Sequence, residues 1–206
     1  MKPIIFSTPM VKAILEGKKT QTRRVIDKDI SNKFDIENDG KTVIAWIHPD
    51  TGDHFEPTYP AKYKVGDVLW VRETWCKVPW TYSNDLGVPD ESYKYFYRAD
   101  GEMNEQHDLH SDYDKWRPSI HMPREAARLF LKVTGVRVER INEITGRDVL
   151  AEGIDNVYTN PKMGERWENA QIMVFEDLWD SLNAKRGYAF RDNCWVWVYE
   201  FERVMG

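Results

Sequence analysis

The residues best suited to chemistry lie in one short basic stretch, from Gly17 to Arg24. Its eight residues hold four cationic side chains and two hydroxyl groups but no acid, in a chain whose net charge is −5. A lysine with a lowered pKa can act as a base, and a threonine hydroxyl can attack a carbonyl or position a water molecule. By spacing alone, a solvated basic turn that enters a strand is the better explanation of the stretch.

A short helix precedes the basic stretch and would position it. Ser7 and Pro9 suit the start of a helix, and the apolar residues after them recur at helical spacing. Gly17 can end that helix in a left-handed conformation. Lys19 and Thr22 lie three residues apart, so a flat strand would place them on opposite faces. Joint action of these two side chains therefore requires a bend or bulge between them.

The clearest strand runs from residue 63 to residue 75, where β-branched and aromatic residues follow a Gly-Asp turn. Each face of this strand is apolar at its start and carries a charge near its end. This pattern predicts a mostly buried strand whose Arg72 and Glu73 reach a rim. A surface ion pair, which contributes little stability, is the alternative.

Three later segments complete the scaffold. Residues 129–141 predict a long strand in which Gly135 suits a bulge, and residues 194–203 predict a final strand that is not an exposed edge. Residues 165–183 predict a helix with an apolar stripe that packs in the core. The stripe consists of Ile172, Phe175, Leu178, Trp179 and Leu182.

A shorter helix carries a glutamate at an unusual place. Thr145 to Asp148 form a capping box that opens the helix, and Gly153 closes it. Glu152 lies in the last turn, where the helix dipole prefers cations. This conflict with local preference suggests a role for Glu152 beyond the helix, whereas a tolerated surface glutamate is the alternative.

The chain as a whole predicts one domain. Its 206 residues, 41% of them hydrophobic, are enough for one core but few for two. About six strands and three helices that do not alternate regularly favour an α+β (mainly β) fold, a largely antiparallel β-barrel with helices across its ends. Two segments are expected to be insertions within the single domain 1–206: a polar one at about 27–62, and an aromatic and acidic one at about 77–118.

Composition also limits the class of protein. No run of about 20 apolar residues and no signal sequence is present, which predicts a soluble, cytoplasmic protein that does not enter a membrane. Cys76 and Cys194 have no metal or redox spacing and suit two buried thiols. The His- and Asp-rich residues 107–114 suit a solvated acidic loop better than a metal site, so no cofactor is expected. The negative net charge argues against a broad DNA-coating face.

The run from Phe6 to Arg24 resembles the ASCH domain, particularly the long form common in bacteriophages and prophages. Three further runs agree with it: residues 66–75, residues 116–127 with the strand after them, and residues 195–203. The resemblance implies a PUA-like β-barrel, a fold associated with recognition of RNA and modified nucleotides. It also implies a location in the cytoplasm of a bacterial host cell.

At the basic motif the chain is similar to a small bacterial branch of that family, whose members remove the acyl group from N4-acetylcytidine. The branch's Gly-basic-Lys-Thr-x-Thr-x-Arg pattern falls on Gly17 to Arg24, so the resemblance implies that Lys19 and Thr22 are catalytic. The family's glutamate falls on Glu152, where the Glu-Gly-Ile sequence departs from that branch. The chain is also considerably longer than members of the branch, and its insertions could reshape or cover the pocket.

Three functions follow as hypotheses. The first is an amidohydrolase acting on N4-acylated cytidine or a related modified nucleoside, with Lys19, Thr22 and Glu152 as its catalytic residues. The second is a non-catalytic RNA-binding module, or a ribonuclease, that uses the same basic pocket and stacks a base on Trp70, Trp75 or Trp116. The third is a phage accessory protein that docks another protein through its aromatic insertions. The oligomeric state stays open. The residues expected to contact a ligand are Lys18, Thr20, Arg23, Arg24, Trp70, Arg72, Glu73 and Trp75.

Overall fold

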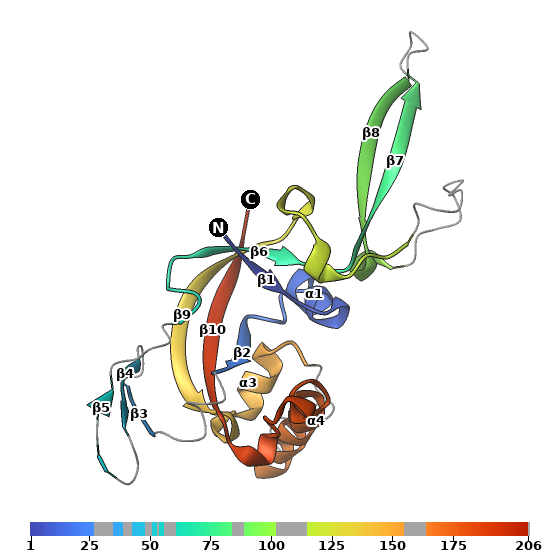
Figure 1. The fold of residues 1–206 in the computed structure, drawn as a ribbon. Coiled ribbons are helices and arrows are strands. Elements are labelled where there is room, and N and C mark those ends of the chain that lie inside the picture. Colours follow the sequence, from blue (N-terminus) through green and yellow to red (C-terminus); the bar gives the residue numbers. More distant parts are fainter. Residues whose placement is uncertain are drawn as a thin grey trace.

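The architecture was taken from a computed structural model of the chain. It describes residues 1–26, 35–38, 43–47, 51–52, 54–55, 61–83, 89–101, 115–154 and 164–205. The body is a five-stranded sheet with strand order β1-β6-β9-β10-β2, packed against helices (Figure 1). Its strands are β1 (Lys2–Ile5), β2 (Gln21–Val25), β6 (Val68–Arg72), β9 (Phe130–Arg140) and β10 (Trp195–Val204).

The fold is mixed α+β and mainly β, as predicted, but the described residues show an open sheet and not a closed barrel. Strands β1 and β2 are its two edges. The guanidinium of Arg24 on β2 donates a hydrogen bond to the main-chain oxygen of Ile5 on β1 at 2.8 Å, so a side chain bridges the two edges. Strand β1 pairs with β6 in parallel, and the other pairs in the sheet are antiparallel.

Three α-helices accompany the sheet in the described part of the chain: α1 (Thr8–Leu15), α3 (Gly146–Ala151) and α4 (Glu165–Asn183). All three were predicted. Thr145 caps α3 with the expected capping box, whereas the Ser7 side chain at the start of α1 makes no capping hydrogen bond. Short 3-10 turns span Arg98–Asp100, Ser119–His121, Arg124–Ala126, Ile141–Glu143, Ala184–Arg186 and Phe190–Asp192.

The two segments expected to be insertions hold small sheets of their own. Strands β3 (Asp35–Asn38), β4 (Val43–Ile47) and β5 (His54–Phe55) form one, and the hairpin of β7 (Trp75–Ser83) and β8 (Pro89–Tyr97) forms the other. The hairpin projects away from the body (Figure 1). The strand predicted over residues 63–75 is therefore divided, because β6 ends at Arg72 and β7 begins at Trp75.

Strand β10 lies between β9 and β2, which confirms that the final strand is not an edge. The predicted bulge is also present, because Glu200 pairs with Gly135 and the next residue, Phe201, pairs with Val133. Alternate side chains of β10 enter two different cores. Trp195, Trp197, Tyr199 and Phe201 face the core under α1, and Val196 and Val198 face the core under α4.

Of the predictions about special sites, the one on the cysteines can be compared with the described residues. Cys76 and Cys194 are both buried and are not joined in a disulfide, as predicted. Residues 107–114 lie outside the described residues, and the part that is described contains no group of three or more potential metal ligands. Among the helices of that same part, none is long and apolar enough to cross a membrane.

Candidate functional site

Lys19 and Thr22 line one cleft in spite of their spacing. Strand β2 begins only at Gln21, so Lys19 lies in the connection after α1 and does not follow the alternation of the strand. Thr22 lies on β2 itself, opposite Tyr199 of β10. Together with Glu152, both side chains line a cleft of about 540 Å³, which we call the Lys19 cleft. The change of direction before β2 is what allows both side chains to line one cleft.

The amine of Lys19 is held by two oxygens of Glu152. Its Nζ donates to the Glu152 main-chain oxygen at 2.7 Å and to the carboxylate Oε2 at 2.9 Å. Both residues are buried, at 3% and 5% exposure. Glu152 caps the C-terminus of α3, and Gly153 follows with a φ of +79°. A Cβ on Gly153 would lie 2.7 Å from the Cβ of Lys19, so this close approach requires glycine.

Burial lowers the pKa of the Lys19 amine, because low-dielectric surroundings disfavour its charged form. The charge and hydrogen bond of Glu152 oppose this effect without cancelling it, and the charges of Arg24 and Arg23 add to the lowering. A neutral amine has two N–H groups and one lone pair. The main-chain and carboxylate oxygens of Glu152 accept from these N–H groups, which leaves the lone pair of the neutral amine to accept a proton.

Arg23, which was expected to contact a ligand, is instead paired with carboxylates. Its Nη1 donates to Glu152 Oε1 at 3.1 Å, its Nε donates to Glu139 Oε1 at 2.9 Å, and its Nη2 also donates to Glu139. Only 1% of its side chain is exposed. Arg23 lines the Lys19 cleft, where it orients the Glu152 carboxylate, and its charge is balanced within the protein.

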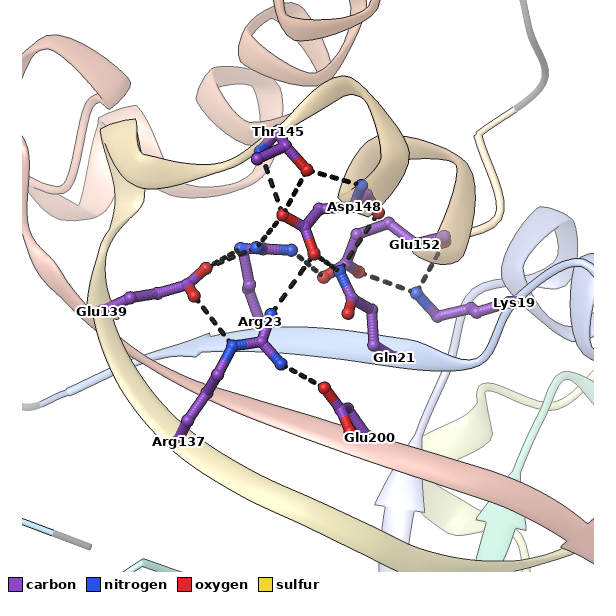
Figure 2. A network of polar contacts seen from close by, with 9 residues as sticks. All are labelled: Lys19, Gln21, Arg23, Arg137, Glu139, Thr145, Asp148, Glu152 and Glu200. Atoms are coloured by element: carbon purple, nitrogen blue, oxygen red, sulfur yellow. Dashed lines mark hydrogen bonds and ion pairs between the residues drawn. The ribbon is translucent and has the colours of Figure 1, made fainter. Parts of the chain in front are cut away.

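A wider polar network ties β2 to α3 and β9 (Figure 2). The Gln21 amide donates to the Asp148 main-chain oxygen at 3.1 Å and to its Oδ1 at 3.0 Å. Arg137 on β9 ion-pairs with Glu139 and Asp148. Burial alone would raise the pKa of Asp148, but hydrogen bonds from Thr145 and Gln21 lower it overall. These contacts fix α3, and with it Glu152, against the strand that carries Thr22.

The other members of the basic stretch are exposed. Lys18 ion-pairs with Glu16 at 2.7 Å, and both side chains are about half exposed. Thr20 joins the main-chain hydrogen bonding next to α3, and its side chain faces solvent. Of these residues, Arg24 lines the Lys19 cleft, with its guanidinium carbon 5.4 Å from the centre of the Phe6 ring.

The residues predicted on the strand at 63–75 are not brought to the Lys19 cleft. Trp70 and Trp75 are buried, at 8% and 3% exposure, and Trp116 lies next to the guanidinium of Arg98. None of these tryptophans is among the described residues that line the cleft. Arg72 lines a different, adjacent cleft. The interpretation of the tryptophans as stacking surfaces therefore gains no support from their positions.

Glu73 does not reach a rim. It is 1% exposed, and its two carboxylate oxygens accept hydrogen bonds from Arg128 Nε and Nη2 at 2.9 and 3.0 Å. Arg128 also donates to Asp100 and lies 3.9 Å from the centre of the Tyr97 ring. Burial raises the pKa of the Glu73 carboxyl, and the Arg128 contacts oppose this. The group is a buried ion pair that connects β6 to the base of the hairpin.

Helix α4 supplies the opposite wall of the Lys19 cleft, which sequence reasoning missed. Phe175 and Trp179 are buried as predicted, but Leu182 is 62% exposed and lines the cleft with Leu178. The apolar stripe extends one turn beyond the core that it covers. This extra apolar turn was the signal in the sequence from which a wall of the cleft could have been predicted. Asn183 and Arg186, at the end of the helix, line the cleft too. The cleft therefore has a polar, basic side and an apolar side.

Comparison with known proteins adds two distant structural likenesses. No family model and no curated protein matches the sequence. The chain is similar to the protein EF3133 of the DUF984 family from Enterococcus faecalis V583, with a TM-score of 0.40 and 10% identity over 100% of this chain and 82% of that one. It is also similar to an ASCH domain from Lactobacillus crispatus JV V101, with a TM-score of 0.34 and 14% identity over 95% and 72%. Likenesses this weak do not establish a function, which must be derived from the residues of this chain.

Proposed function

We propose that the protein is an amidohydrolase that removes the acyl group from an N4-acylated cytidine, with Lys19, Thr22 and Glu152 as its catalytic residues. One observation carries the proposal. A buried lysine with a lowered pKa is held by a glutamate, in the same cleft as a threonine hydroxyl. Nucleophile, base and orienting group are the parts that covalent amide hydrolysis requires.

The first half of the reaction transfers the acyl group to the enzyme. The Thr22 hydroxyl oxygen attacks the amide carbonyl carbon, and its proton passes to the neutral amine of Lys19. The protonated Lys19 and the exposed Arg24 are two of the cations that line the cleft, and they stabilise the developing oxyanion. Collapse of the tetrahedral intermediate breaks the C–N bond, and the N4 amine leaves with the proton from Lys19.

The second half restores the enzyme. A water molecule attacks the acyl-threonine ester, Lys19 again takes the proton, and the carboxylic acid leaves as Thr22 regains its hydrogen. Alternatively, Thr22 positions a water molecule that attacks the amide directly, without an acyl-enzyme. In both routes Glu152 fixes the Lys19 amine through its main-chain oxygen and its carboxylate Oε2, and Arg23 holds the Glu152 carboxylate in place.

The alternative is an RNA-binding module or ribonuclease that uses the same basic pocket. The exposed Arg24 and the cleft's basic side are compatible with it. It differs in its requirement for Thr22, because phosphate contacts depend on cations and not on a hydroxyl that attacks an amide. Thr22→Val keeps the shape of the side chain and removes that hydroxyl alone.

The test is a discontinuous assay in which purified protein is incubated with N4-acetylcytidine and cytidine is separated by chromatography. We expect turnover by the wild type, and a loss of at least about 100-fold in Thr22→Val and Lys19→Ala. Thr134→Val is the matched control, since Thr134 is exposed and lines neither of the two described clefts. Absence of turnover by folded wild type, or full activity of Thr22→Val, would refute the proposed mechanism.

A further inference from the structure

A second cleft adjoins the Lys19 cleft on the other side of Arg24, between the edge strands β1 and β2. Its volume is about 490 Å³, and Ile5, Arg24 and Val25 line both clefts. We call it the seam cleft, because it lies where the open sheet is not closed by strand pairing. No role described so far uses it.

Three cations line the seam cleft: Arg24 on β2, Lys62 before β6, and Arg72 at the end of β6. Lys62 and Arg24 are exposed, and Arg72 is half-buried. Among the described residues that line it there is no carboxylate, although the chain carries a net charge of −5. This concentration of positive charge on an acidic protein favours an anionic ligand at this place.

Most hydrogen-bond donors of the two arginines stay available in the seam cleft. Arg24 Nη2 donates to the Ile5 main-chain oxygen at 2.8 Å, and Arg72 Nε donates to the Met122 main-chain oxygen at 3.0 Å. A guanidinium has five N–H groups, so each of these bonds positions the side chain and leaves donors for a ligand. Guanidinium groups held in this way suit the bidentate recognition of phosphate.

Buried aromatic side chains line the seam cleft together with these cations. Tyr63 and Tyr199 meet edge to face with their ring centres 5.0 Å apart, and Trp197 lines the same cleft. The Tyr63 hydroxyl donates to the Pro3 main-chain oxygen at 2.7 Å, and the Tyr199 hydroxyl accepts from the Lys62 amide at 3.2 Å. The Tyr63 O–H is therefore engaged within the protein, and the cations are the main groups left to recognise an anionic ligand.

We propose that the seam cleft binds the phosphate of a ligand whose base occupies the Lys19 cleft, so that the protein prefers a phosphorylated cytidine derivative to the free nucleoside. The shared position of Arg24 allows one ligand to enter both clefts. The phosphate is a phosphomonoester of a nucleotide or a phosphodiester of RNA. The placement of the base rests on the proposed function, whereas the phosphate contacts require only the seam cleft.

The test measures binding and needs no turnover. Calorimetric titrations compare cytidine, cytidine 5′-monophosphate and a cytidine trinucleotide with the full chain at one low salt concentration. We expect the phosphorylated ligands to bind about tenfold more tightly or better, with the preference lost in Arg72→Gln and Lys62→Gln. A preference for the monophosphate over the trinucleotide identifies a nucleotide ligand, and the reverse identifies RNA.

Lys132→Gln is the matched control, because the Lys132 side chain is 50% exposed and lines neither cleft. If Arg72→Gln loses its fold together with the Met122 contact, the exposed Lys62 carries the test. Equal affinity for cytidine and its monophosphate, or an equal loss in Lys132→Gln, would overturn the inference. Charge-dependent binding without hydrolysis of N4-acetylcytidine would refute the amidohydrolase but leave the seam cleft standing.

Discussion

Replacement of Gly153 by alanine is predicted to displace Lys19, because Gly153 packs directly against it. Gly153 has a φ of +79°, and a Cβ at this position would lie 2.7 Å from the Cβ atoms of both Ala13 and Lys19. Carbon atoms pack best at about 3.5–4.0 Å, so the neighbours must separate by about 1 Å. They belong to α1 and to the connection that carries Lys19, so Lys19 must move relative to Glu152.

The expected loss of stability in Gly153→Ala has two parts. A left-handed conformation costs an alanine about 1–2 kcal/mol, and overpacking a tight contact costs about 1–3 kcal/mol, for a total of about 2–5 kcal/mol. Gly17→Ala separates the two, because Gly17 has a φ of +73° but nothing within 4 Å of an added Cβ. It carries the conformational cost without the overpacking, and the gain from a less flexible unfolded chain is common to both variants.

Urea unfolding of both variants and the wild type, followed by circular dichroism, measures the free energy of unfolding. We expect Gly153→Ala to be less stable than Gly17→Ala by about 1–3 kcal/mol. Under conditions where both are folded, deacylation by Gly153→Ala should fall by about 100-fold, the effect of a displacement of about 1 Å at a reacting group. Equal stabilities, or an unchanged rate in Gly153→Ala, would refute the reasoning.

Two further predictions concern the charged groups. Activity should rise with pH as Lys19 loses its proton, and Glu152→Gln should move the midpoint of this rise to lower pH, because Glu152 raises the pKa of Lys19 while burial lowers it. A pH–rate profile of kcat/KM checks this, with Glu139→Gln expected to keep the wild-type midpoint; a shift of Glu152→Gln to higher pH would contradict it. Arg128→Ala should lower the free energy of unfolding by about 3–5 kcal/mol, because it leaves the buried Glu73 carboxylate without its partner. Urea unfolding measures this loss, and a change below about 1 kcal/mol would show that Glu73 is accommodated without Arg128.

Much of the fold could be predicted from local patterns. The capping box at Thr145, the start of α1 and the long apolar strand β10 depend on residues that are near neighbours in the chain, so their signals are complete within a short window. Whether the sheet closes into a barrel could not be predicted in this way, and the predicted closure is not seen among the described residues. Closure depends on whether β1 and β2 pair with each other. The sequence of each strand is compatible with an edge strand as well as with a strand that is paired on both sides.

The candidate site was predicted in part. The resemblance at the basic stretch pointed to Lys19, Thr22 and Glu152, and the structure brings these three residues to one cleft. The roles of Arg23 and Arg24 could not be distinguished, because they are adjacent cations. Arg23 is buried and pairs with the carboxylates of Glu139 and Glu152, whereas Arg24 is exposed and lines both clefts.

The sequence by itself determined which residues had unusual local chemistry: a basic stretch after a glycine-terminated helix, and a glutamate where a helix dipole favours a cation. Only the tertiary structure decided which of these groups meet. Lys19 and Glu152 are 133 residues apart, and their contact depends on the packing of α3 against the start of β2. Burial, which lowers the pKa of Lys19, is a property of that packing, because a low dielectric arises only when distant segments together exclude water.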